Sequence, residues 1–227
     1  MKTKIAILVL GSAIFMASCS DKKEKTQDTS KEEIVHKAVI NSPDDAILEL
    51  KNGNARFVSN KLINTDYKHQ IDQTKGGQHP HSVILSCLDS RVPPEIIFDQ
   101  GIGNIFVARN AGNIEDLNNL GSMEFATKLK GTKLIVVMGH KDCGAVTGAI
   151  ANAQLGNLTQ LLDQIKPAII QDDNKEKMID ETVINNIKMT IADILERSPV
   201  ISELVKENKV KIVGAYYDIT TGKVTFM

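Results

Sequence analysis

The sequence predicts an α/β fold with a mainly parallel central sheet of four strands, a short antiparallel edge strand and helices on both faces. Three observations support this fold class. Short apolar runs alternate with longer segments whose apolar residues recur at helical spacing. The runs are apolar at consecutive positions, which is typical of strands buried on both faces. Hydrophobic residues make up 42% of the 227 residues, which is enough for one globular core.

Five segments have the composition of strands. The third is the clearest, because residues 133–139 (KLIVVMG) are rich in β-branched residues and apolar on both faces. Gly222 marks a turn before the last segment, which is therefore expected to pair antiparallel. In chain order the predicted strands are Ser82–Ser86, Ile105–Ala108, Lys133–Gly139, Lys209–Tyr217 and Lys223–Phe226.

The segments between the strands have helical periodicity. The first begins at Pro43 and continues with two aspartates, a combination that favours a helix N-terminus. Residues 59–80 are polar and turn-rich, so neither a helix nor a strand is predicted there. The predicted helices cover residues 43–58, 118–130, 143–153, 158–171, 175–197 and 199–208.

The N-terminal residues have the pattern of an export signal. Two lysines precede a 14-residue uncharged stretch, and small residues lead up to Cys19. This pattern resembles a bacterial lipoprotein signal, in which the cysteine is lipidated and becomes the new N-terminus. We therefore expect a signal peptide over 1–18, a lipidated cysteine and flexible tether over 19–42, and a folded domain over 43–227. An uncleaved N-terminal anchor helix is the alternative.

The expected location follows from that signal. Acyl chains on Cys19 would partition into a membrane and hold the domain there. The protein is thus predicted to be exported and lipid-anchored to a bacterial membrane, facing the periplasm or the cell surface. With 27 basic and 28 acidic residues, the net charge of -1 argues against nucleic-acid binding. Three cysteines are too few for a disulfide scaffold.

The two remaining cysteines lie in motifs that follow predicted strands. Cys87 begins the stretch CLDSR, and His140 and Cys143 lie in the stretch GHKDCG. Neighbouring parallel strands end at the same edge of a sheet, so these three side chains are expected to converge. Two thiols and one imidazole suit zinc, with the fourth position open for water in a catalytic site. The predicted helix start at Cys143 is expected to favour its thiolate.

Other interpretations of the same residues remain open. A structural four-ligand zinc site would require Asp89 as the fourth ligand. Cys87 and Cys143 are alternatively inert buried thiols, with His140 a hydrogen-bonded histidine at a strand end. A disulfide between the two cysteines is a further possibility in an oxidising compartment.

The two motifs together resemble the zinc signature of the β-class carbonic anhydrases. The similarity extends from about Gly53 to the C-terminus and is densest between Gln78 and Ala149. It implies one zinc ion per chain, held by the two cysteines and the histidine. The implied reaction is the reversible hydration of carbon dioxide to bicarbonate and a proton by zinc-bound hydroxide. The flanking stretches that match are ILSCLDSRVPPEIIF (84–98), FVARNAGN (106–113) and GHKDCGAV (139–146).

Asp89 and Arg91 are the expected catalytic residues. Paired with Arg91, Asp89 stays ionised and off the metal, where it accepts a hydrogen bond from zinc-bound hydroxide. Without Arg91 it can close onto zinc as a fourth ligand. A surface ion pair worth about 0–1 kcal/mol is the alternative interpretation.

The resemblance also implies a substrate pocket. It assigns Gln78, Phe106 and Gly112 to substrate binding. Gln78 and Phe106 would come from the neighbouring subunit, so a homodimer or tetramer is expected. An ordinary loop position for Gln78 and core packing for Phe106 are the alternatives.

Three other functions would use the same motifs. A hydrolase of carbon disulfide or carbonyl sulfide would have the same metal ligands and a different pocket. A non-catalytic zinc scaffold would be expected to lack a ligand or the Asp89–Arg91 pair, and the sequence has both. A thiol redox protein would keep its activity after chelation of the metal and lose it on alkylation of the thiols.

Overall fold

A computed structural model describes residues 40–227. The predicted signal peptide, the lipidation site Cys19 and the tether up to residue 39 lie outside the described residues. Within residues 40–227, none of the helices combines the length and the apolar character needed to span a membrane.

The described chain forms one five-stranded sheet with the order β2-β1-β3-β4-β5. The first four strands pair in parallel, and β5 pairs antiparallel with β4 at the edge. This confirms the predicted fold class. The strands are β1 (Ser82–Cys87), β2 (Ile105–Asn110), β3 (Leu134–His140), β4 (Lys211–Tyr217) and β5 (Val224–Phe226).

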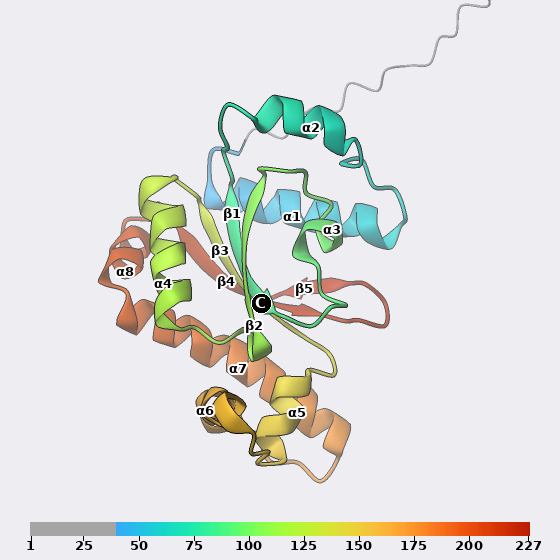
Figure 1. Cartoon of the computed structure of the whole chain (residues 1–227), viewed down its shortest axis with the longest axis vertical. Coiled ribbons are helices and arrows are strands. Elements are labelled where there is room, and N and C mark those ends of the chain that lie inside the picture. Colours follow the sequence, from blue (N-terminus) through green and yellow to red (C-terminus); the bar gives the residue numbers. More distant parts are fainter. Residues whose placement is uncertain (1–39) are drawn as a thin grey trace, which may run out of the picture. The chain divides into compact units, whose positions relative to one another are not determined.

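Helices connect the strands and cover both faces of the sheet (Figure 1). Helix α4 continues into one π-helical turn over Phe125–Leu129, and α6 into a short 3-10 segment over Lys166–Ala168. The α-helices are α1 (Pro43–Val58), α2 (Tyr67–Thr74), α3 (Pro94–Ile97), α4 (Leu117–Glu124), α5 (Gly144–Ile150), α6 (Gly156–Ile165), α7 (Lys175–Arg197) and α8 (Pro199–Lys206).

The prediction of a continuous loop over residues 59–80 was wrong, because α2 lies inside it. The side chain of Asp66 accepts a hydrogen bond from the His69 amide at 3.0 Å and caps the helix. None of the eight residues of α2 is buried, so the segment has no apolar stripe for periodicity to detect.

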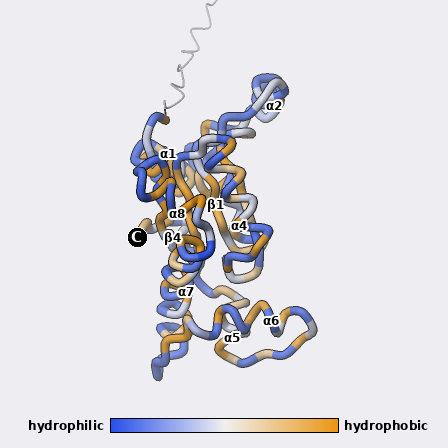
Figure 2. The backbone as a smooth tube through the Cα atoms, turned by 90° about the vertical axis from the view of Figure 1, so that its left-hand side faces the viewer, coloured by the Kyte–Doolittle hydropathy of each residue, from blue (hydrophilic) through white to orange (hydrophobic). Residues whose placement is uncertain are grey.

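Alternate residues of the strands face two separate apolar layers. On one side Leu85 and Val137 pack with α4, α5, α6, α7 and α8. On the other side Ile84 and Val136 pack with α1 and α3. Figure 2 shows hydrophobic segments concentrated around β1 and hydrophilic ones along the outlying α2. This two-layer burial explains why the strand sequences are apolar at consecutive positions.

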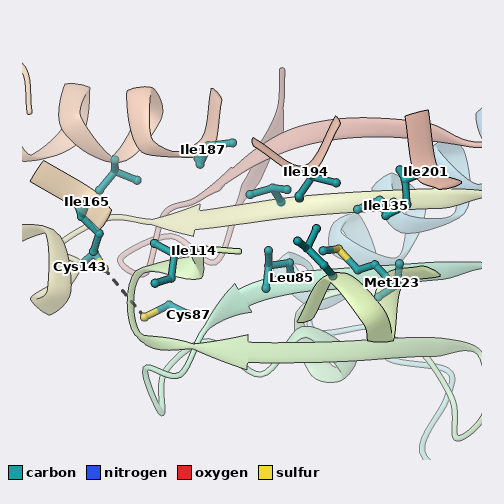
Figure 3. Close-up of a cluster of buried hydrophobic side chains, with 14 of the residues drawn as sticks. Leu85, Cys87, Ile114, Met123, Ile135, Cys143, Ile165, Ile187, Ile194 and Ile201 are labelled. Atoms are coloured by element: carbon teal, nitrogen blue, oxygen red, sulfur yellow. Dashed lines mark hydrogen bonds between the residues drawn. The ribbon is translucent and has the colours of Figure 1, made fainter. Parts of the chain in front are cut away.

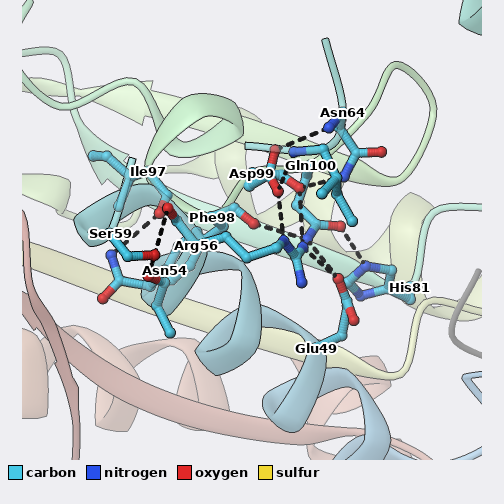
Figure 4. Close-up of polar contacts among 12 residues, drawn as sticks. Glu49, Asn54, Arg56, Ser59, Asn64, His81, Ile97, Phe98, Asp99 and Gln100 are labelled. Carbon is cyan, nitrogen blue, oxygen red and sulfur yellow. Dashed lines mark hydrogen bonds and ion pairs between the residues drawn. The ribbon is translucent and has the colours of Figure 1, made fainter. Parts of the chain in front are cut away.

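A buried polar network joins α1 to the segment after α3 (Figure 4). The Nε atom of Arg56 donates to Asp99 Oδ2 at 2.5 Å, and Asp99 also accepts the amides of Ile63 and Asn64 at 3.1 Å each. Close approach of the two segments requires Gly53, because a Cβ atom there would lie 1.8 Å from the carbonyl oxygen of Phe98. The network therefore fixes α1 and the residues after it against the segment that follows α3.

Candidate metal centre

Three potential metal ligands converge at the carboxyl ends of two neighbouring strands. Cys87 is the last residue of β1, His140 is the last residue of β3, and Cys143 is the N-cap of α5. Their ligand atoms all lie within 4.8 Å of one another, and all three residues are buried. The two sulfur atoms are 4.0 Å apart (Figure 3). The parallel pairing of β1 with β3 brings these side chains together from positions 53 and 56 residues apart in the sequence.

The His140 imidazole presents a free lone pair to this cluster. Its Nδ1 donates to the carbonyl oxygen of Lys141 at 2.8 Å, because a carbonyl can only accept. That bond leaves Nε2 unprotonated in the neutral ring. Nε2 is buried and has no hydrogen-bond partner among the residues that the structure describes. A buried polar atom without a partner destabilises the fold, and a metal ion at this position would satisfy it.

The two thiols compete for one negative charge. The hydrogen bond that the Cys87 thiol makes with Cys143 lowers the pKa of Cys87 to about 4. Conversely, that hydrogen bond with Cys87, together with burial, raises the pKa of Cys143, although amides at the start of α5 act in the opposite direction. The amides at the start of α5 therefore favour the Cys143 thiolate, as expected from the sequence, while the neighbouring Cys87 sulfur and burial oppose it. A divalent cation between the sulfurs would allow both to ionise, as the donor set of a zinc site requires.

Asp89 and Arg91 lie beside the cluster as an ion pair. Arg91 donates through its Nη2 to Asp89 Oδ2 at 2.7 Å and through its Nε to Oδ1 at 3.0 Å. These bonds hold the pKa of Asp89 down at about 2. Oδ2 of Asp89 is 4.0 Å from His140 Nε2, which is too long for a hydrogen bond. The carboxylate thus sits next to the ligand set, ionised and bound to Arg91.

Arg109 supports this loop and was not singled out from the sequence. Its Nε donates to the carbonyl oxygen of Cys87 at 3.0 Å, and its Nη2 donates to that of Asp89 at 2.7 Å. The guanidinium therefore fixes the backbone on which a ligand and the acidic residue are carried. Its position in the matched stretch FVARNAGN was the available signal.

Gly112 touches the cluster directly. Its amide donates to the Cys87 sulfur at 3.4 Å, and its φ of +76° lies in the left-handed region. A Cβ atom on Gly112 would lie 2.5 Å from Cδ1 of Ile165, so any other residue would have to displace that side chain and adopt a strained φ.

Gln78 and Phe106 lie at the other end of the sheet from the cluster. Gln78 is an exposed residue before β1, whereas Cys87 ends that strand. Phe106 pairs in register with Val83 near the start of β1. It lines a cavity of about 430 Å³ beside β2 and packs edge-on against Phe125, with 6.3 Å between ring centroids. A single chain therefore does not bring these two residues to the metal ligands.

Comparison with known proteins identifies the family. The carbonic anhydrase family model matches residues 82–224. "Carbonic anhydrase 2" of Mycobacterium tuberculosis is 37% identical over 184 residues, covering 77% of this chain and 87% of that protein. The carbonic anhydrase of Mycolicibacterium smegmatis is 33% identical over 183 residues, covering 77% and 88%.

Solved structures give the same result for the fold. The β-carbonic anhydrase CcaA matches with a TM-score of 0.65 and 26% identity, covering 80% of this chain and 94% of that one. One of two tetrameric β-carbonic anhydrases from Sordaria macrospora matches with a TM-score of 0.66 and 25% identity, covering 81% and 97%. The chain belongs to the β-class carbonic anhydrases, which confirms the resemblance drawn from its motifs.

Proposed function

We propose that this chain hydrates carbon dioxide reversibly to bicarbonate and a proton, using one zinc ion held by Cys87, His140 and Cys143. The observation that carries the proposal is the buried Cys–His–Cys cluster of a family member, in which the His140 Nε2 atom has no hydrogen-bond partner within residues 40–227. When bound, zinc would supply the Lewis acidity that lets water ionise near neutral pH.

The surrounding residues would hold the ligands and orient the nucleophile. Arg91 keeps Asp89 ionised beside the cluster, so that Asp89 can accept a hydrogen bond from the attacking oxygen and direct its lone pair towards carbon dioxide. Arg109 holds the carbonyl groups of Cys87 and Asp89, which keeps the ligand and the carboxylate in one fixed arrangement. Loss of the pairing with Arg91 would free Asp89 to approach the metal as a fourth ligand.

The substrate pocket would require a second copy of the chain. Gln78 and Phe106 are remote from the cluster within one chain, so their assigned role requires a dimer or tetramer. Exposed apolar side chains beside the Phe106 cavity support such an interface, since Leu117 is 77% exposed and Phe125 is 45% exposed. A related protein from Sordaria macrospora is described as tetrameric.

The chain would act at a membrane. The lipoprotein-like sequence around Cys19 supports export, lipidation and attachment to a bacterial membrane, with the enzyme facing the periplasm or the cell surface. The support for this part of the proposal is the residue pattern of the first nineteen positions.

The proposal is tested on the full chain purified in detergent. Zinc content and stopped-flow hydration of carbon dioxide would be measured on the same samples. Cys143→Ser should lose both the bound zinc and the hydration activity. Asp89→Asn should keep its zinc, and its turnover rate should fall by about 10- to 100-fold. Ser90→Ala, an exposed neighbour of Asp89, should keep both. Zinc without carbon dioxide turnover would contradict the proposal and favour a carbon disulfide or carbonyl sulfide hydrolase, or a scaffold.

A further inference from the structure

Helix α7 reaches the candidate metal centre through one buried side chain. Asn186 is 3% exposed, and its Nδ2 donates to the carbonyl oxygen of Gly112 at 2.8 Å. On its other side, the amide of Gly112 donates to the sulfur of Cys87 at 3.4 Å. A chain of two hydrogen bonds thus runs from α7 through Gly112 to a predicted metal ligand.

Gly112 needs support from outside its own residue. It has no side chain to restrict its backbone torsions, and it adopts a φ of +76°. A larger residue would be strained at this φ and would have to displace the end of the Ile165 side chain. The direction of the Gly112 amide therefore depends on what holds the adjoining backbone, and Asn186 holds its carbonyl.

Packing fixes the position of α7 itself. Val183 and Ile187 lie so close to Gly139, the residue before His140, that a Cβ atom there would approach their side chains to 2.8 and 2.9 Å. Nearer the start of the helix, Glu176 accepts a hydrogen bond from Lys141 Nζ at 2.6 Å. Asn186 is consequently carried on an element that is tied to the same strand end as the ligands.

We infer that Asn186 is a positioning residue of the metal centre, which keeps the Gly112 amide aimed at the Cys87 sulfur. The inference rests on the proposed zinc site. An N–H donor at a thiolate withdraws charge from the sulfur and orients it, so its loss should change both the electronic character of the metal–sulfur bond and the affinity for metal.

The test compares Asn186→Leu with Asn185→Leu in the full chain. Asn185 is a matched control, because its Nδ2 also donates from α7 to a carbonyl, that of Ala168 at 2.9 Å. Both variants and the wild type would be loaded with Co²⁺ as a spectroscopic probe. In Asn186→Leu the thiolate-to-cobalt charge-transfer band should move to lower energy, and chelator competition should show affinity weakened by about 10- to 100-fold. Asn185→Leu should match the wild type.

A second measurement separates this role from general stability. The increase in unfolding temperature caused by Co²⁺ depends on affinity for the folded state, so it should be smaller for Asn186→Leu than for Asn185→Leu. Asn186→Ser replaces the leucine variant if the latter does not fold. Identical bands and equal temperature shifts in the two variants would overturn the inference. A wild type that binds no Co²⁺ would overturn the proposed metal centre, and this inference with it.

Discussion

Replacing Gly53 with alanine should destabilise the protein, although the same change stabilises most helices. In the interior of a helix, alanine is favoured over glycine by about 1 kcal/mol. Here the new Cβ atom would lie 1.8 Å from the carbonyl oxygen of Phe98, which is a backbone atom and cannot move by a rotamer change. Overpacking of this kind typically costs about 1–3 kcal/mol. Taking the upper end of that range, the net loss is about 2 kcal/mol.

The clash in Gly53→Ala would push α1 away from Phe98, and this movement would weaken particular contacts of α1. Moving α1 away from Phe98 would stretch the bond from Asn54 Nδ2 to the carbonyl of Ile97, now 3.2 Å, and the Arg56–Asp99 ion pair. For a folded part of this size, a loss of about 2 kcal/mol lowers the unfolding temperature by about 4–8 °C. Thermal unfolding followed by circular dichroism would measure it, at fixed protein and zinc concentrations.

The control is Asn52→Ala, one position earlier on the exposed side of α1. It gains helix propensity without a new contact, so it should be neutral or slightly stabilising. If Gly53→Ala were as stable as Asn52→Ala, the steric explanation for Gly53 would be refuted.

Three further predictions concern the site and the anchor. Arg91→Ala should raise the pKa of Asp89 from about 2 towards its ordinary 3.8. Asp89 would then become protonated at a higher pH as the solution is acidified, and an NMR titration of Asp89 would show this shift. Gly112→Ala should weaken zinc binding, because φ is +76° and Ile165 blocks a Cβ atom; chelator competition would measure this, and unchanged affinity would contradict it. Cys19→Ser should release the protein from membrane pellets into the soluble fraction, and persistent sedimentation with membranes would argue for an uncleaved anchor helix.

Much of the fold could be predicted because local and tertiary signals agree. Helices α1 and α7 begin and end where the sequence predicts. In both, the capping residue stands directly before the segment with helical apolar spacing: Ser42 caps α1 and Asn174 caps α7. In helix α2 the two signals disagree: Asp66 caps its N-terminus, but none of its residues is buried, so it has no apolar pattern. The four-residue α3 is too short for periodicity to detect.

The candidate site was predictable to the extent that strand order determines it. Cys87 and His140 end adjacent parallel strands, so the motifs alone implied their convergence. The contributions of Arg109 and Asn186 depend on where their side chains reach, across 22 and 74 residues of sequence. The hydrogen bond between the two thiols depends on their 4.0 Å separation in the folded chain, which no residue pattern encodes.

The two apolar layers bear on how this family can accept insertions and deletions. A one-residue insertion within β3 would exchange the faces of Ile135 and Val136, and because both faces are apolar, the hydrophobic pattern alone would not oppose this exchange. The same insertion would carry His140 one position past Tyr217, its partner on β4, and away from Cys87. The position of His140 and the close packing of Gly139 against α7, rather than the apolar pattern, therefore determine the register of this strand. Length changes should be tolerated in the exposed connection between α8 and β4, at the opposite end of the sheet, and not between Leu134 and Cys143.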